Sequence, residues 1–172
     1  DFVNIEKLVC SPDNNGTPYN SSYTLYLDVS PLVNLKELLV SGNRLGTLDV
    51  SQNILLEKLS CGGNLLNSLQ LTNNVNLKHL VCGNTGISSD PISSNLHYNA
   101  FKTLDLSNNH LLEYVYCSYA TINDLILGSN TNLKQLHCAN SGLTSLDVTQ
   151  LPNLEQLICG VYDRLFYYYP IY

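Results

Sequence analysis

The sequence contains little charge, no methionine, no tryptophan and no long apolar run. Charged residues make up 13% of its 172 residues, and the formal net charge is −6. A basic surface that could hold a phosphate backbone is therefore not expected, which argues against nucleic acid as a partner. No apolar segment approaches the roughly 18 to 20 residues that cross a bilayer, so no membrane span is predicted.

Methionine is also missing from position 1, where the chain has Asp1. A natural translation product begins with methionine, so we expect that an upstream segment has been removed. Removal of an export signal and artificial truncation at Asp1 both account for this observation.

Leucine-rich triplets recur along the chain with a period of 21 residues, interrupted by one longer gap. One register consists of Leu27–Val29, Leu48–Val50, Leu69–Leu71, Leu104–Leu106, Leu125–Leu127 and Leu146–Val148. A second register, of the form Leu-x-x-Leu-x-Cys, is complete in five copies, and Ile5–Cys10 and Leu35–Val40 bring the total to seven. Such self-similarity indicates stacked structural repeats, and we assign residues 1–172 to a single domain.

The pattern Leu-x-x-Leu-x-Cys-x-x-Asn-x-Leu, clearest in Leu56–Leu66, resembles the core of the leucine-rich repeat. Leu104–Asn109 resembles the 21-residue variety common in surface and secreted proteins of Bacteroidetes-type bacteria. The resemblance implies an α/β-type repeat solenoid, mostly β, with about seven coils, a parallel front sheet and short back strands. It also implies a secreted or bacterial cell-surface protein, with the removed N-terminal segment as the place for an anchor. The repeat asparagine is missing at Thr85, Ala120 and Ser141, so those turns are expected to differ in shape.

Two sets of polar residues in the repeat are interpreted as structural. Asparagines recur where each coil turns after its triplet, at Asn53, Asn74, Asn109 and Asn130. Their side chains can satisfy backbone groups of the turn that would otherwise be unpaired. The aspartates inside the triplets are expected to face outward into solvent.

Alternation along a strand sends the middle residue of each front strand into the core and its two neighbours outward. In the fifth and sixth copies bulky outward residues stand out, and small residues follow them. We expect an accessible aromatic platform there, suited to a protein or a glycan. The candidate ligand-binding residues are His79, Tyr114, Tyr116, Tyr119, Gln135 and His137, with Tyr98 and Phe101 of an inserted loop. Alternatively the tyrosines only pack along an exposed strand; for Tyr116 a small contribution to stability is expected.

Two insertions interrupt the period, at about residues 11–24 and 88–102. Both follow a front strand, so they are expected to project from one edge and to extend the binding face. Because loop length costs little entropy, we expect deletion of Ser88–Asn99 to leave the solenoid folded. The aromatic segment 161–172 is interpreted as a C-terminal cap, with a docking strand for a partner as the alternative.

The repeated cysteines predict a ladder with one thiol in each coil. Parallel, in-register Cβ atoms lie farther apart than the roughly 3.5 to 4.5 Å that a disulfide requires. Reduced and buried thiols are therefore predicted at Cys61, Cys82, Cys117, Cys138 and Cys159. Sulfur atoms along a line do not converge on a metal, no Cys-x-x-Cys pair occurs, and His79 and His137 lack a third ligand. No metal and no cofactor is expected.

The sequence shows no catalytic constellation. His137 and Cys138 are adjacent, but alternation points them to opposite faces, so they cannot share a proton. Neither a Gly-x-Ser-x-Gly motif nor a phosphate-binding loop occurs. We therefore predict a non-catalytic module that binds a protein or glycan through its concave face and inserted loops. The alternative is a structural spacer that presents another domain of a larger surface protein.

Overall fold

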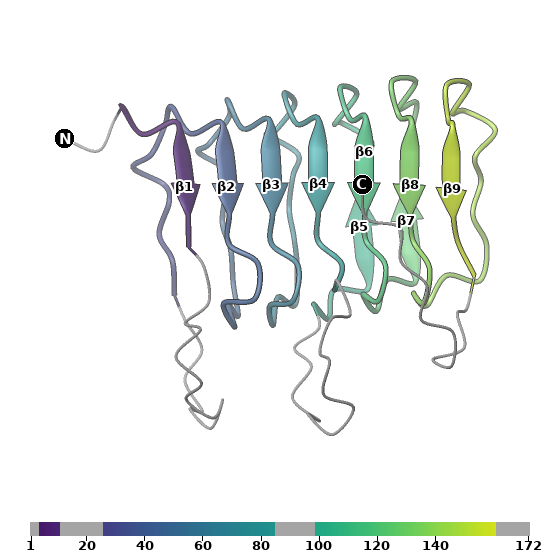
Figure 1. Cartoon of the computed structure of the whole chain (residues 1–172), viewed down its shortest axis with the longest axis horizontal. Coiled ribbons are helices and arrows are strands. Elements are labelled where there is room, and N and C mark those ends of the chain that lie inside the picture. Colours follow the sequence, from purple (N-terminus) through teal and green to yellow (C-terminus); the bar gives the residue numbers. More distant parts are fainter. Residues whose placement is uncertain (1–3, 11–25, 85–98, 161–172) are drawn as a thin grey trace.

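The computed structural model describes residues 4–10, 26–84 and 99–160, in which short strands stack side by side into an elongated solenoid (Figure 1). Its front is a parallel sheet in the order β1-β2-β3-β4-β6-β8-β9. The front strands are β1 (Lys7–Val9), β2 (Glu37–Leu39), β3 (Lys58–Ser60), β4 (His79–Val81), β6 (Tyr114–Tyr116), β8 (Gln135–His137) and β9 (Gln156–Ile158). These are the strands that the Leu-x-x-Leu-x-Cys register predicts, so the predicted front sheet is confirmed.

Neighbouring front strands pair without offset, so equivalent residues of successive coils lie beside each other. Leu59 of β3, for example, lies opposite Leu80 of β4, and both side chains are fully buried. The residues on either side of each leucine face outward. Burying a leucine side chain stabilises a fold by roughly 1.5–3 kcal/mol, and here the burial requires the next coil. Each coil therefore depends on its neighbours for its core.

The back of the solenoid is less regular than the sequence predicts. Among the described residues only β5 (Thr103–Asp105) and β7 (Asp124–Ile126) form a back sheet. Backbone bonds join them, such as the one from the Leu106 amide to the Ile126 carbonyl at 2.8 Å. In other described coils asparagine side chains make the bonds between coils at this level. The prediction of a back strand in every coil is therefore wrong.

Two further expectations about the architecture need correction. No α-helix occurs in the described residues, so the α/β-type label does not apply. The expected number of about seven coils is too high, because the described residues form about five turns of a parallel solenoid. The predicted cap at 161–172 and most of both insertions also lie outside the described residues.

A ladder of buried asparagines joins successive coils behind the core. The Asn53 amide group donates to the carbonyls of Val29 and Leu32, both at 2.9 Å. Asn74 and Asn109 repeat this arrangement in the following coils. Each side chain satisfies two buried carbonyls that would otherwise lack a partner. The structural role predicted for these asparagines is confirmed.

The triplet aspartates are exposed, as predicted, but they also have a local role. The Asp49 carboxylate accepts a hydrogen bond from the Ser51 amide at 2.9 Å. This bond lowers the pKa of Asp49 below its ordinary value. Asp105 makes the equivalent bond with Ser107. These carboxylates thus fix the turns that follow their triplets, in addition to being solvated.

A second asparagine position, after the front strand, shows where the longer insertion ends. Asn64 donates to the carbonyl of the cysteine in its own coil and to the equivalent carbonyl of the coil before. Asn99 donates in the same way to the carbonyls of Cys61 and Cys82, at 3.0 and 2.8 Å. Asn99 therefore belongs to the regular coil and not to the insertion predicted at 88–102.

Phe101 follows Asn99 into the core. Its side chain is 1% exposed, at the position that buried Leu66 holds in the preceding coil. The prediction that Phe101 binds a ligand is therefore wrong. Phe101 lies in the longer gap between two triplets and was therefore assigned to a loop, because the sequence does not show at which residue the regular repeat begins again. Tyr98, predicted with it, lies outside the described residues.

Candidate ligand-binding face

Strands β4, β6 and β8 bring together the site residues predicted on the front sheet. In the sheet register His79 lies opposite Tyr114, which lies opposite Gln135. The second row places Tyr116 opposite His137. These five residues, the front-face cluster, lie on one face of three adjacent strands, because alternate residues of a strand share a face.

The rings of the front-face cluster are in contact. The Tyr114 ring centroid lies 6.4 Å from that of His79 and 5.6 Å from that of His137. His137 also meets Tyr116 nearly edge-on, at 5.8 Å and 65°. Edge-to-face packing favours defined ring orientations. The cluster is therefore a preformed aromatic surface with Tyr114 at its centre.

Tyr116 has a structural role that the sequence did not indicate. Its hydroxyl donates to the Asn84 carbonyl at 3.1 Å, which ties β6 to the turn after β4. Partial burial raises the pKa of Tyr116 to about 12. Truncation of Tyr116 would remove this bond, so a loss of stability is expected to accompany any loss of binding in such a variant.

Burial affects Tyr114 less than Tyr116. It raises the pKa of Tyr114 above the ordinary value, and the side chain remains partly exposed. Gln135 and His137 are partly exposed as well. His137 Nε2 lies 3.3 Å from Oε1 of Gln156 in β9, so the polar rim continues onto the next strand.

Tyr119 lies in the turn after β6 with a φ of 59°. This left-handed conformation favours glycine, and Gly42 and Gly63 hold the equivalent position of earlier coils with φ of 75° and 61°. A tyrosine here costs conformational energy that a glycine would not. Tyr119 is partly exposed and lies near Tyr116, so it belongs to the border of the cluster.

The glycines beside the front-face cluster are explained by backbone packing rather than by access for a ligand. A Cβ atom on Gly83 would lie 2.2 Å from the Ser118 carbonyl oxygen, and one on Gly62 would lie 2.0 Å from the Gly83 carbonyl oxygen. Adjacent turns thus approach too closely to admit a side chain at either position. Ser118 is itself buried.

The thiols lie behind the front sheet and take no part in the cluster. All six cysteines are free, and Cys61, Cys82, Cys117 and Cys138 are buried as predicted. Burial raises the pKa of Cys61 to about 12 and that of Cys138 to about 11. These thiols stay protonated at neutral pH and are poor nucleophiles. Cys159 is exposed, contrary to the prediction, because no described strand covers the outer side of β9.

Among residues 4–10, 26–84 and 99–160, no three histidine, cysteine or acidic side chains are placed to hold a metal ion. In the same ranges no helix has the length and hydropathy needed to cross a membrane.

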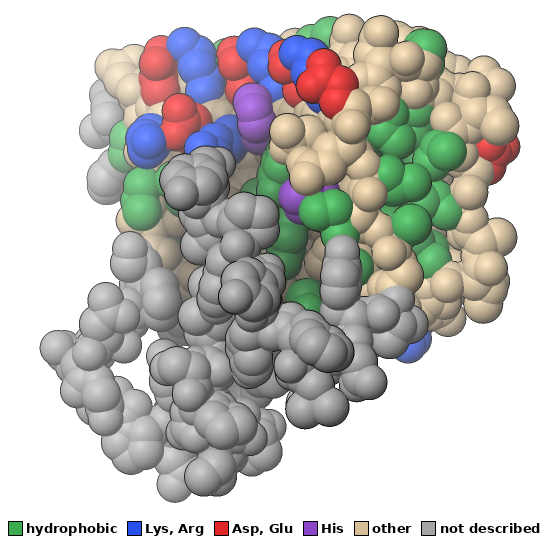
Figure 2. All heavy atoms as spheres, turned by 45° about the vertical axis from the view of Figure 1, so that its right-hand side comes forward, with side chains coloured by type: hydrophobic (Ala, Val, Ile, Leu, Met, Phe, Trp, Pro, Cys, Tyr) green, Lys and Arg blue, Asp and Glu red, His purple; other side chains and the backbone are tan. Residues whose placement is uncertain are grey.

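Sequence analysis missed a row of charges along one edge of the solenoid, seen at the top of Figure 2 as alternating acidic and basic side chains. This charge row consists of the residues directly before the front strands, Glu6, Lys36, Glu57, Lys78, Glu113, Lys134 and Glu155. Its ion pairs are Lys36–Glu6 at 2.9 Å, Lys78–Glu57 at 2.8 Å and Lys134–Glu113 at 2.9 Å. Comparison of the same position in all seven copies would have found the alternation.

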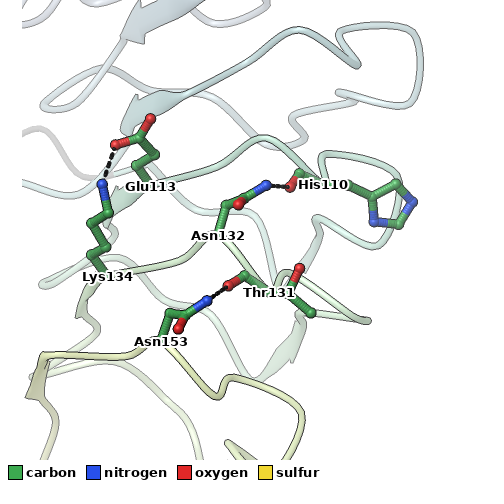
Figure 3. A network of polar contacts seen from close by, with 6 residues as sticks. All are labelled: His110, Glu113, Thr131, Asn132, Lys134 and Asn153. Atoms are coloured by element: carbon green, nitrogen blue, oxygen red, sulfur yellow. Dashed lines mark hydrogen bonds and ion pairs between the residues drawn. The ribbon is translucent and has the colours of Figure 1, made fainter.

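Asparagines form a parallel row beside the charge row. Figure 3 shows the Lys134–Glu113 pair next to two side-chain bonds, from Asn132 to the His110 carbonyl and from Asn153 to the Thr131 carbonyl. These bonds measure 2.9 and 2.8 Å. This edge is therefore linked from coil to coil by charge pairs and amide bonds together.

Solved structures supply the comparison for this architecture; no protein family and no curated protein matches the sequence. The functional domain of InlJ from Listeria monocytogenes, which includes a cysteine ladder, is 29% identical with a TM-score of 0.52. The match covers 78% of this chain and 32% of that one. The chain is a leucine-rich-repeat solenoid.

Two more distant structures share the fold of this leucine-rich-repeat solenoid. A leucine-rich-repeat protein of Leptospira interrogans is 19% identical with a TM-score of 0.52, over 76% of this chain and 38% of its own. The internalin InlF of Listeria monocytogenes is 19% identical with a TM-score of 0.53, over 78% of this chain and 44% of its own. The leucine-rich-repeat solenoid thus spans less than half the length of each of these three proteins.

Proposed function

We propose that the leucine-rich-repeat solenoid is a non-catalytic module of a secreted or cell-surface protein and binds a protein through its front-face cluster. The contact among His79, Tyr114, Tyr116 and His137 on adjacent strands carries the proposal. A preformed surface of amphipathic rings loses little conformational entropy on binding. The likeness to internalins supports an interaction module, and the raised thiol pKa values speak against nucleophilic catalysis.

Two alternatives are compatible with the same solenoid. A glycan could stack on the tyrosine rings, since sugars present apolar faces to aromatic side chains. A spacer that only presents another domain would make no use of the front face. The three cases differ in what happens when Tyr114 is replaced.

The proposal is tested with the immobilised solenoid and proteins released from a cell surface, followed by affinity measurement with the captured partner. Tyr114→Ala should weaken binding by about 2 kcal/mol, as the loss of a central aromatic anchor does. Asp49→Ala, on the opposite side of the solenoid, is the matched control and should leave affinity unchanged. Equal affinity of Tyr114→Ala and the parent chain would remove the cluster from the mechanism. Binding that survives proteolysis of the partner but not its deglycosylation would identify a glycan instead.

A further inference from the structure

An exposed apolar strip lies on the edge that carries the charge row. It consists of five side chains that are 39% to 53% exposed and are called the turn patch, namely Val33, Ile54, Leu55, Val75 and Leu111. All five lie in the turns before β2, β3, β4 and β6, two or three residues before the charge-row residue of the same coil. Neighbouring coils are about 4.8 Å apart, so these side chains form one continuous strip. Five of the nine large apolar side chains that the described residues expose therefore lie together on one edge.

Two leucines of the turn patch take the place of a residue that links coils elsewhere. In the equivalent position Asn76 and Asn132 each donate to a carbonyl of the preceding coil at 2.9 Å. Leu55 and Leu111 cannot donate such a bond and expose apolar surface instead. Within a single chain this exchange loses a hydrogen bond and leaves apolar surface in water, which contact with another molecule would bury.

The charge row is self-complementary between two antiparallel copies of the chain. From the coil of β1 to that of β9 its members alternate in sign, as the top of Figure 2 shows. If two copies met along this edge in parallel, each coil would face the same coil of the other copy, and like charges would be opposed throughout. In the antiparallel arrangement with the coil of β3 facing that of β4, Glu57 of each copy faces Lys78 of the other. The coils of β2 and β6, and those of β1 and β8, then also face each other with opposite charges.

The turn patch selects the same register. With the coil of β3 facing that of β4, Ile54 and Leu55 face Val75 of the other copy. Val33 then faces Leu111. A shift by one coil sets like charges against each other. A shift by two coils keeps the charges opposite, but it brings Leu55 to the polar turn before β8 in one direction and moves Leu111 beyond β1 in the other. A single register therefore satisfies the charges and the apolar side chains together.

We infer that the solenoid pairs with a second copy of itself along this edge, antiparallel, with the coil of β3 facing that of β4. The two-fold axis lies in the contact plane and runs across the stack between these coils, so the turn patch covers the turn patch and the charge row covers the charge row. The front strands form a straight stack in Figure 1, which allows contact along the whole edge. Both front-face clusters stay uncovered and face the same side, so this pairing is independent of binding at the front face.

The contact is small, and the pairing is therefore weak and reversible. It extends over six strands about 4.8 Å apart, which is roughly 30 Å, and it is one solenoid edge wide. Such a contact buries less than the roughly 1,200 Å² of a standard interface, so we expect a dissociation constant on the order of 0.1 mM.

Sedimentation of the full chain between about 10 μM and 1 mM measures the pairing, at low ionic strength and with a reductant that keeps the exposed Cys159 from forming cross-links. The average mass should rise from 19.1 kDa toward twice that value. Leu55→Asn should weaken self-association by about tenfold or more without lowering the melting temperature, because it supplies the asparagine that other coils have. A mass of 19.1 kDa at every concentration would overturn the inference.

Charge exchange between molecules tests the register. Glu57→Lys and Lys78→Glu should each weaken self-association by about tenfold or more, because each variant opposes like charges at two places in the dimer. An equimolar mixture of the two variants should recover the pairing, since every introduced charge then faces its opposite. Mixing does not repair the Lys78–Glu57 ion pair within either chain, so only a contact between chains in this register explains recovery.

Asp124→Lys on the back strand β7 is the matched control, with the same charge change at an exposed position away from the edge. It should leave self-association within about twofold, since distant exposed charges are screened. A mixture of the two edge variants that stays monomeric would refute the antiparallel register. Loss of self-association in Tyr114→Ala, with Leu55→Asn unaffected, would move the contact to the front face and overturn the inference as well.

Discussion

Each buried residue of this solenoid has as neighbours the equivalent residues of the coils before and after it. Cys82 shows the consequence for ionisation, because Cys61 and Cys117 flank it in the ladder. Burial raises the pKa of Cys82 well above its ordinary value, and the two neighbouring thiols raise it further. No cation balances a thiolate in such surroundings, so folding favours the protonated form.

This preference predicts a loss of stability at alkaline pH. Above about pH 9 the unfolded chain releases the protons of Cys61, Cys82, Cys117 and Cys138 while the folded chain keeps them, so the contribution of these thiols to stability is constant below about pH 8 and is lost as pH rises. Each thiol should contribute a slope of about 1 kcal/mol per pH unit between pH 9 and 10, because ionisation of the unfolded thiol is not yet complete at pH 9. Urea unfolding at pH 8, 9 and 10 measures the slope. Cys82→Ala should reduce the slope by about a quarter, because it removes one of the four thiols; an unchanged slope in this variant would mean that other groups cause it.

Tyr119 permits a second test at the level of one residue. Its φ of 59° suits glycine, so Tyr119→Gly should leave the free energy of unfolding unchanged or raise it by up to about 1 kcal/mol. Tyr119→Val should lower it by more than about 1 kcal/mol, because a β-branched side chain is strained at positive φ. Denaturant unfolding of both variants gives the comparison. A glycine variant less stable than the valine variant would show that the tyrosine ring, and not the backbone, determines stability at this turn.

At the scale of one coil, the asparagine after the front strand determines where the repeat resumes after an interruption. Asn64 donates to a carbonyl 24 residues earlier, and Asn99 makes the equivalent bond to a carbonyl 38 residues earlier. The extra chain lies between Asn84 and Asn99, so residues 85–98 are the part that the regular coil does not require.

Two deletions distinguish this boundary from the one that sequence spacing predicts. Removal of residues 85–98 joins Asn84 to Asn99 at the regular period and should change the free energy of unfolding by less than about 1 kcal/mol. Removal of Ser88–Asn99, expected from the sequence to leave the solenoid folded, takes away the Asn99 side chain and leaves the buried carbonyls of Cys61 and Cys82 unpaired. It should cost about 3 kcal/mol or more. Thermal and urea unfolding of both variants provide the measurement, and equal stability would argue against a structural role for Asn99.

The sequence predicted elements where one residue type dominates a register, and failed where geometry decides between two uses of the same residue type. Leucine and cysteine at fixed spacing located every front strand and its inward face. The sequence is compatible with Phe101 in a loop or in the core, because it does not show which asparagine makes the first regular bond to the preceding coil after the insertion. In the structure Asn99 makes this bond and Phe101 is buried. The prediction of a back strand in every coil was wrong for a similar reason, since the Leu-Asp-Val triplets are compatible with both a strand and an irregular segment. At the site, alternation placed the front-face cluster correctly, but the bond from Tyr116 to Asn84 depends on a turn whose shape alternation does not describe.

At the scale of the whole molecule, each described front strand pairs only with its immediate neighbours, so the sheet joins adjacent coils and not distant ones. Stability in such a structure is the sum of each coil's own contribution and the contacts between adjacent coils. Inner coils have two neighbours, whereas the coil of β9 has one described neighbour and an exposed Leu157. The ends should therefore open more often than the middle.

Hydrogen exchange of two equivalent amides tests this difference. Lys58 and Gln156 occupy the same position in β3 and β9. The Lys58 amide donates to the Lys36 carbonyl at 3.0 Å, and the Gln156 amide donates to the Lys134 carbonyl at 2.9 Å. Although the two bonds are alike, the Gln156 amide should exchange about 100-fold faster than the Lys58 amide or more, because the coil of β9 can unfold locally while the inner coils stay folded. Similar protection of the two amides would show that all coils unfold as one cooperative unit.

The alternation of the charge row has a consequence for how a solenoid of this kind can change its length. Every coil is interchangeable with every other as far as strand pairing is concerned, but glutamate and lysine exchange places from one coil to the next. Loss of the single coil that carries Lys78 would bring Glu57 beside Glu113, two like charges on adjacent strands. Loss of two consecutive coils would leave the order of signs intact. A change of length that keeps the order of charges therefore involves an even number of coils, so the electrostatic repeat is twice as long as the repeat that the leucines define.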